Sequence, residues 1–277
     1  MPNFFSFAEQ VLISPDVETK LSLTHQAWQW HQQVHLKLET PATSPTSAVA
    51  ITPLSPESAR FPEKPVLVDP RDLPKRKLTS TEGKVALLHA VAHIEFSAIQ
   101  LAWDHLYRFR DMPQQYYRDW LGVAEEEALH FELLRGRLRE FGAEYGDLPA
   151  HAGLWGIATE TAYDVLARMA LVPRFMEARG LDVTPGMIAK LQNIGDISSV
   201  KILERILHDE VGHVALGSHW FQWICGQRGL NPEEEYFRLI ERHMKGQARG
   251  PFNLELRRLA GFSDAELILL DKGQGFA

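Results

Sequence analysis

The chain has 277 residues, of which 45% are hydrophobic and 23% are charged, a composition typical of globular proteins and not of disordered or fibrous chains. Its net charge of −7 disfavours nucleic acid as a partner, because phosphate backbones are bound by basic surfaces. A single cysteine, Cys225, excludes an internal disulfide and sites built from paired cysteines. We therefore expect a cytoplasmic location, with neither a secretion signal nor a membrane span.

The N-terminal part of the sequence predicts one helix followed by an extended arm. Residues 15–39 have the apolar spacing of an amphipathic helix. Residues 40–74 are rich in proline, serine and threonine, which favours extended backbone. Two interpretations of this arm stay open at this point. It is either a flexible linker or a segment that lies along the main domain through the apolar residues between Phe61 and Val68.

From Ser80 onward the pattern is helical, with no alternation of period two. Four long helices are predicted, at about residues 82–110, 114–141, 154–179 and 196–227. Ser80 and Asp196 are their capping candidates, while Gly142, Gly180 and Gly229 follow helix ends. Pro173 predicts a kink in the third helix. Shorter helices are expected at about residues 185–193, 232–246 and 263–270.

These elements predict an all-α chain built around a four-helix bundle. We assign the N-terminal helix and the arm to residues 1–79, the bundle to residues 80–230 and a C-terminal helical extension to residues 231–277.

Each long helix carries a glutamate on its apolar stripe, and two of them add a histidine. In chain order the residues are Glu95, Glu127-x-x-His130, Glu177 and Glu210-x-x-His213. A spacing of three places the carboxylate and the imidazole on one helix face. Residues 95 and 127 are 32 positions apart and residues 177 and 210 are 33 apart, so the chain resembles two copies of one helical hairpin.

Four carboxylates and two imidazoles are the ligand set of a di-iron or di-manganese centre. Without metal, so many buried acids would repel one another and take up protons, whereas two divalent cations neutralise them. One Glu-x-x-His pair arises by chance in a chain of this composition, so the prediction depends on the whole set. The alternative is that these residues satisfy one another without metal.

Several neighbouring residues have two alternative roles. Glu177 lies near the predicted end of its helix, and Glu160 is the alternative ligand there. Asp209 and Glu126 each precede a ligand glutamate and either accept a hydrogen bond from a ligand imidazole or are surface acids. His89 and His93 we interpret as packed or hydrogen-bonded histidines.

Four phrases carry a family resemblance: ALLHAVAHIEFSAIQLAWDHLYRF, EEEALHFELLRGRL, MALVPRFMEARGLDVTP and ILHDEVGHVALGSHWF. They resemble the domain-of-unknown-function 455 family (DUF455), within the ferritin-like superfamily of di-metal carboxylate proteins, over about residues 60–225. The resemblance implies a ferritin-like bundle with the six ligands named above. It implies no substrate.

The expected function is that of an oxidase or hydroxylase that uses O2 or peroxide and two iron ions, with manganese or a mixed Mn/Fe pair as alternatives. The expected partners are a small-molecule substrate and O2, without a membrane, and a homodimer is left open. The alternatives are a ferroxidase or iron-handling protein and a binding protein with a vestigial site. A tRNA-modifying hydroxylase is supported only by superfamily analogy.

Overall fold

The computed structural model describes residues 4–34, 53–73, 77–244 and 250–271 and confirms the all-α class. Among these residues, extended backbone pairs only at one parallel bridge, between Leu67 and Ala150. The chain divides into two compact units, Met1–Thr159 and Glu160–Ala277. The domain boundaries expected after residues 79 and 230 stay predictions.

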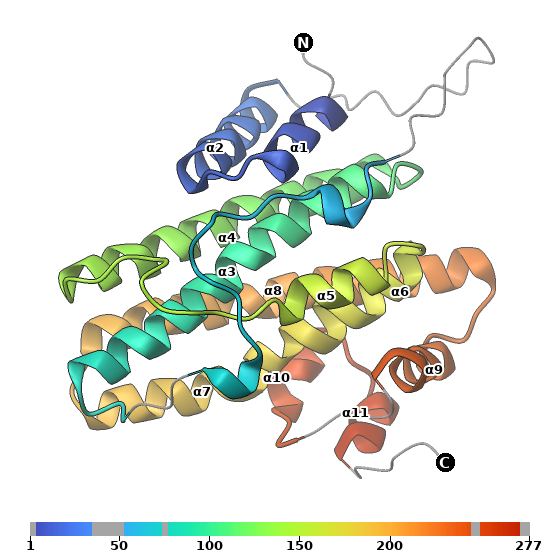
Figure 1. The fold of residues 1–277 in the computed structure, drawn as a ribbon. Coiled ribbons are helices and arrows are strands. Elements are labelled where there is room, and N and C mark those ends of the chain that lie inside the picture. The colour runs from blue at the N-terminus through green and yellow to red at the C-terminus, as the bar shows by residue number, and fades with distance from the viewer. Residues whose placement is uncertain (1–3, 35–52, 74–76, 245–249, 272–277) are drawn as a thin grey trace. The chain divides into compact units, whose positions relative to one another are not determined.

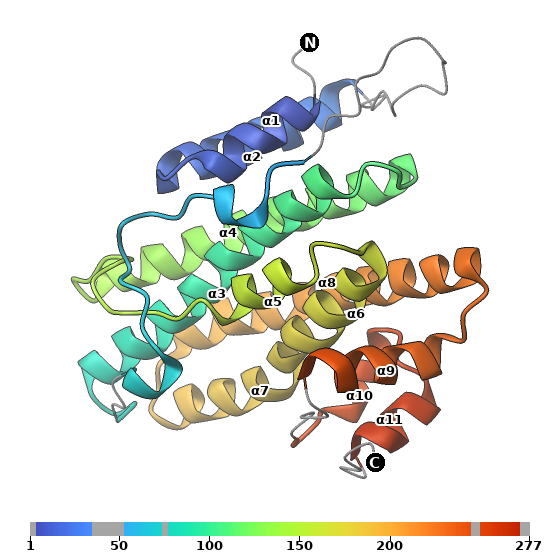
Figure 2. The same cartoon turned by 45° about the vertical axis from the view of Figure 1, so that its right-hand side comes forward.

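The first unit is built on a pair of long antiparallel helices, α3 and α4 (Figures 1 and 2). Its elements are α1 Phe4–Ile13, α2 Val17–Val34, η1 Pro56–Ser58, η2 Pro70–Asp72, α3 Thr81–Arg108, α4 Gln114–Glu140 and α5 Gly153–Glu160. α3 packs along α4, while α1 packs on α3 and α2 on α4. The Ser80 hydroxyl accepts a hydrogen bond from Gly83 N (3.1 Å) and caps α3 as predicted. Large aromatic side chains such as Trp103 and Trp120 fill the core.

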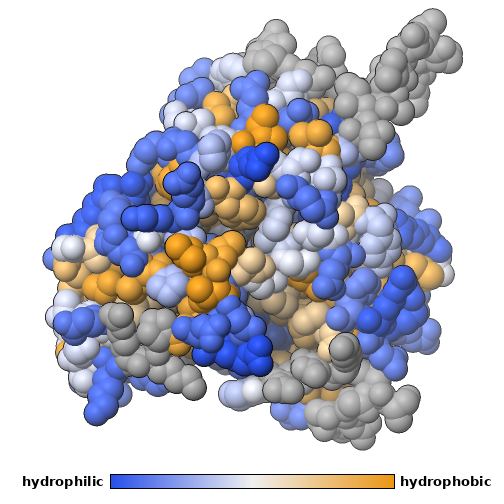
Figure 3. All heavy atoms as spheres, in the orientation of Figure 1, coloured by the Kyte–Doolittle hydropathy of each residue, from blue (hydrophilic) through white to orange (hydrophobic). Residues whose placement is uncertain are grey.

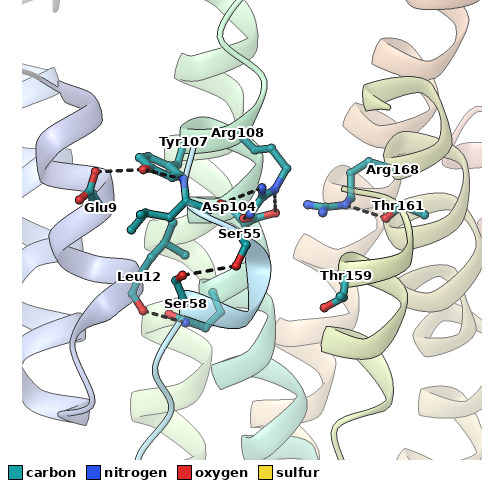
Figure 4. A network of polar contacts seen from close by, with 12 residues as sticks. Glu9, Leu12, Ser55, Ser58, Asp104, Tyr107, Arg108, Thr159, Thr161 and Arg168 are labelled. Atoms are coloured by element: carbon teal, nitrogen blue, oxygen red, sulfur yellow. Dashed lines mark hydrogen bonds and ion pairs between the residues drawn. The ribbon is translucent and has the colours of Figure 1, made fainter. Parts of the chain in front are cut away.

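Residues 53–73 of the proline-rich arm lie along the first unit, which agrees with the second interpretation of this segment. The backbone N–H of Leu54 donates to the Tyr107 hydroxyl (3.1 Å), which in turn donates to Glu9 in α1 (2.9 Å). The Tyr107 and Glu9 side chains point toward each other in Figure 4, with the arm beside them. Residues 40–52 of the predicted arm lie outside the described residues.

The second unit is built on a helical rod that packs along one long helix. Its elements are α6 Val165–Leu171, the π-helix η3 Val172–Glu177, α7 Ala178–Asn193, α8 Ile197–Arg228, α9 Pro232–Met244, α10 Leu254–Leu259 and α11 Asp264–Asp271. α6, η3 and α7 follow one another without a break, and all three pack on α8. Asp196 caps α8, and Gly229, with φ of 64°, ends it, as predicted. Both helical pairs that a four-helix bundle requires are therefore present in the chain.

The third long helix, predicted at residues 154–179, begins near its predicted start, at Gly153 in α5, but it is interrupted within this range and continues beyond its predicted end. The helix is interrupted before α6, because Asp164 caps a new helix with its own side chain. Gly180 and Pro185 do not end it, since both lie inside α7. Pro173 produces a π-helical turn instead of a simple kink. Proline has no backbone N–H to donate, and its ring clashes with the preceding turn of a regular α-helix. The wider π-turn makes room for the ring.

Two helices were not expected from the sequence, α1 and α10. α1 contains Phe7, Val11 and Leu12, which are buried, but its ten residues are too few for a strong helical pattern. The helix expected at residues 15–39 is α2 as far as Val34, and the C-terminal helices expected at 232–246 and 263–270 are α9 and α11. Residues 35–39 and 245–246 of these predictions lie outside the described residues.

α3 is the one described helix that is long and apolar enough to cross a bilayer by length and composition alone. Within its most apolar window, 72% is buried inside the protein, as in a core helix. On the face drawn in Figure 3, hydrophobic residues stand in small groups between hydrophilic ones.

Candidate metal centre

The antiparallel pair α3–α4 brings three predicted ligands together. Glu95 lies in α3, and Glu127 and His130 lie one turn apart in α4; their exposed fractions are 3%, 1% and 1%. His130 Nδ1 is 3.2 Å from Glu95 Oε2 and 3.5 Å from Glu127 Oε2. Each residue offers a ligand atom within 4.8 Å of those of the other two. This triad could hold a metal ion.

The electrostatics of the triad favour a cation. Burial lowers the pKa of His130, but the hydrogen bonds and charges of Glu127 and Glu95 outweigh it and raise the pKa to about 11. The imidazole is therefore charged and lies beside two buried glutamate side chains. Buried ionised groups are costly unless other charges compensate them. A divalent cation could take the place of the imidazole proton among these oxygen and nitrogen atoms, so the donor set fits a metal that prefers such ligands.

The second unit repeats half of this geometry on α8. His213 Nδ1 lies 3.5 Å from Glu210 Oε1, the same separation as in the Glu127–His130 pair. The His213 side chain is buried, and that of Glu210 is mostly buried. Glu177 is the last residue of η3, which packs on α8, and it is half-buried. Each unit thus carries a helix with one candidate glutamate beside a helix with a Glu-x-x-His motif.

The other acidic candidates lie in different surroundings. Glu160 ends α5 and is therefore not on the same helix as Glu177, and its side chain is 60% exposed. Asp209 accepts a hydrogen bond from Arg205, one turn earlier on α8 (2.5 Å). Glu126 is half-buried on α4. The proposed hydrogen bonds from ligand imidazoles to Asp209 and Glu126 stay predictions.

Comparison with known proteins assigns the family. The family described as "Protein of unknown function (DUF455)" matches residues 13–268. The chain belongs to the DUF455 family. An uncharacterized protein of Haemophilus influenzae is 45% identical to it over 216 residues, which cover 76% of this chain and 75% of the relative. No solved structure matched the chain. All six predicted ligands of this DUF455 protein fall within the matched range, which extends beyond residues 60–225 in both directions.

His89 and His93 of the DUF455 chain are hydrogen-bonded core residues, as predicted. His93 Nδ1 lies 2.9 Å from the Tyr145 hydroxyl, and its Nε2 lies 3.2 Å from the carbonyl oxygen of His151. His89 Nε2 accepts a hydrogen bond from Gly146 N (2.9 Å). Burial lowers the pKa of His93 to about 4 and also lowers the pKa of His89. Both imidazoles are therefore neutral near pH 7.

Tyr145 is a residue beside the triad that the sequence pattern did not reveal. Its ring centroid lies 5.5 Å from that of Phe96 and 4.9 Å from that of Phe131. These phenylalanines directly follow the candidate ligands Glu95 and His130 in sequence. Tyr145 lies in a turn after α4, where no helical period marks it as buried. The three rings form one aromatic group in the core of the first unit.

Proposed function

We propose that this DUF455 protein binds two divalent metal ions and uses them to oxidise or hydroxylate a small molecule with O2 or peroxide. The proposed metal is iron, with manganese or a mixed Mn/Fe pair as alternatives, because carboxylate and imidazole ligands suit both. The proposed ligands are Glu95, Glu127, His130, Glu177, Glu210 and His213. The observation that carries the proposal is the buried Glu95–Glu127–His130 triad, whose two glutamates raise the pKa of His130.

The protein residues would have three tasks in such a centre. The four carboxylates and the two imidazoles would hold the two ions. Six protein ligands for two ions would leave coordination positions for small molecules. Buried Phe96 and Phe131 would keep bulk water away from the triad. Bound iron would supply the redox chemistry that O2-dependent oxidation requires.

Metal analysis tests the binding part of the proposal. The wild-type chain, Glu127→Gln and the matched control Glu125→Gln are purified alike, and iron and manganese are counted per chain. Glu125 is a close control because it lies on the same helix but pairs with His25 on α2 (2.8 Å). We expect about two metals per chain in the wild type and the control, and a clear loss in Glu127→Gln. Less than about one metal in the wild type would reject the proposal.

Oxygen consumption separates an oxidase from an iron-handling protein. Excess Fe(II) is added to the protein in the presence of O2, first without and then with a reductant, and the iron retained per chain is counted. A ferroxidase oxidises the excess without the reductant and retains Fe(III) beyond the ions of the centre, whereas an oxidase retains only those ions and consumes further O2 only when the reductant is present. Light scattering completes the test, since a large hollow oligomer that retains iron would favour storage.

A further inference from the structure

The guanidinium of Arg174 is fully buried in the second unit, inside the π-helix η3. Its Nη2 donates to both carboxylate oxygens of Glu266 (2.9 and 2.8 Å), and its Nε donates to Ser218 Oγ (3.0 Å). Glu266 lies in α11 and is only 2% exposed. The three residues therefore join η3, α8 and the C-terminal helix through one buried ion pair.

Aromatic rings enclose this ion pair and fix the backbone beside it. The Arg174 guanidinium lies 4.8 Å from the ring centroid of Phe221, 4.3 Å from that of Tyr236 and 4.5 Å from that of Phe262. The Tyr236 hydroxyl also donates to the carbonyl oxygen of Arg174 (3.0 Å). Both the side chain and the main chain of residue 174 are thus held from α8, α9 and the segment before α11.

The π-helix is also held closely against α8. A Cβ atom at Gly217 would come within 2.4 Å of Pro173 Cβ, so only glycine permits this approach. Ser218, the next residue, is the one that accepts from Arg174. Residues 173 and 174 are therefore held against α8 by close packing and by a hydrogen bond.

Glu266 is itself held in place by the first turn of α11. Ser263 N donates to Glu266 Oε2 (2.8 Å), and Glu266 N donates to Ser263 Oγ (3.1 Å), which is the reciprocal arrangement of a capping box. The carboxylate that pairs with Arg174 is thus preorganised by its own helix. Movement of α11 and movement of η3 are coupled through it.

We infer that Arg174 and Glu266 are positioning residues for Glu177, which lies three residues after Arg174 in the same π-helix. This inference rests on the proposed function, in which Glu177 is a metal ligand. Removing the charge of Glu266 leaves a buried cation without its counterion, and η3 must shift to resolve the imbalance. The shift displaces Glu177 but leaves Glu95, Glu127 and His130 unchanged.

The test is an anaerobic titration of the full-length chain with Fe(II), comparing Glu266→Gln with Asp182→Asn. Asp182 is a matched control because it forms a second buried ion pair, with Arg257 (2.9 and 2.8 Å). That pair ties the C-terminal segment to α7 instead of η3. We expect two sites in the wild type and in Asp182→Asn. In Glu266→Gln one site stays tight and the other weakens by about tenfold or more.

A double-variant comparison makes the role of Glu177 explicit. Glu177→Ala weakens the same site as Glu266→Gln, and the combination weakens it no further than Glu177→Ala alone. In metal-free protein, hydrogen exchange of residues 172–180 is faster in Glu266→Gln than in Asp182→Asn. Glu266→Asp, which keeps the charge on a shorter side chain, is titrated in the same way if Glu266→Gln does not fold.

The outcomes distinguish the two claims. Two equally tight sites in both Glu266→Gln and Asp182→Asn would overturn the positioning role and leave the metal centre standing. An equal loss of Fe(II) affinity in both variants would also overturn the positioning role. Both substitutions would then act through the overall stability of the second unit. A wild-type chain that binds less than one metal would overturn the proposed function and this inference with it.

Discussion

The two helical pairs carry the same ligand pattern but hold their single glutamate differently. In the first unit, Glu95 lies within α3, a regular helix of 28 residues that packs along α4. In the second unit, Glu177 ends a π-helix of six residues that begins beside Pro173. A regular helix positions its ligand by local hydrogen bonds and packing. A π-turn is rare and depends on surrounding contacts to persist.

The contacts that support η3 come from distant parts of the chain. Arg174 and Glu266 are 92 residues apart in sequence, whereas the α3–α4 triad spans 35. The comparison teaches that one pattern of proposed ligands can be supported by a nearly self-contained hairpin or by a C-terminal extension. It predicts that the second pair responds more strongly to distant changes than the first.

Replacing the histidines gives the largest expected effect. His130→Ala and His213→Ala should each lose about one metal per chain, with affinity for that ion reduced on the order of 100-fold, because each removes a proposed ligand. His208→Ala is the control, since His208 is an exposed neighbour on α8. Metal counts after gel filtration measure the loss. Retention of two metals in both alanine variants would show that neither histidine is a ligand. It would contradict the ligand pattern proposed for both helical pairs.

Glycine-to-alanine replacements compare the packing of the two pairs. Gly217→Ala should lower the free energy of unfolding by about 2 kcal/mol, because the new Cβ would collide with Pro173. Gly136→Ala on α4 should raise it by roughly 0.5–1 kcal/mol, because nothing lies within 4 Å and alanine favours the helix. Urea denaturation measures both. Equal effects at the two positions would contradict the close approach of η3 to α8.

Lys20 makes the stability of the first unit depend on pH. The side chain is fully buried, and its Nζ lies 2.5 Å from Val11 O and 2.6 Å from Gln100 Oε1, two short bonds that a neutral amine can donate. Burial lowers its pKa to about 7 from 10.5. Between these values only the unfolded chain binds the proton, so the free energy of unfolding rises with pH.

Lys20→Met removes this titration. From pH 7 to 10 the wild type should gain about 1 kcal/mol per pH unit relative to the variant, while below pH 7 the difference stays constant. Urea denaturation of both proteins at several pH values gives the difference. A difference that does not change above pH 7 would show that the buried amine stays charged.

The smallest expected effect concerns two tyrosines. Tyr145→Phe should cost about 1 kcal/mol, because it removes a buried hydrogen bond to His93, while the number of bound metals stays the same. Tyr163→Phe in the second unit removes a hydrogen bond to His243 from an exposed ring and should change stability by less than about 0.5 kcal/mol. Thermal unfolding of the two variants provides the comparison.

The parts of the fold that depend on local signals could be predicted from the sequence. Ser80 and Asp196 cap α3 and α8 with their own side chains, and Gly142 and Gly229 adopt positive φ where α4 and α8 end. The ligand pattern was visible because a helical period places Glu127 and His130 on the same buried face. The structure then brings Glu95 to them across α3 and α4.

Features that depend on distant contacts could not be predicted. Pro173 indicates a disturbance of the helix, but only the packing on Gly217 and Ser218 determines that it becomes a π-turn. Glycine often ends a helix, but Gly180 lies inside α7, which packs along α8. Glu266 is an ordinary N-terminal helix acid in the sequence, and nothing local indicates its distant partner.

Diffraction from crystals of the purified protein, recorded at the iron and manganese absorption edges, tests the central claim most directly. The account predicts two anomalous peaks, with Glu95, Glu127 and His130 among the ligands on one side and Glu210 and His213 on the other. It also predicts Glu177 within coordination distance of one ion. Crystals without anomalous peaks, or with metal bound only by other residues, would contradict it.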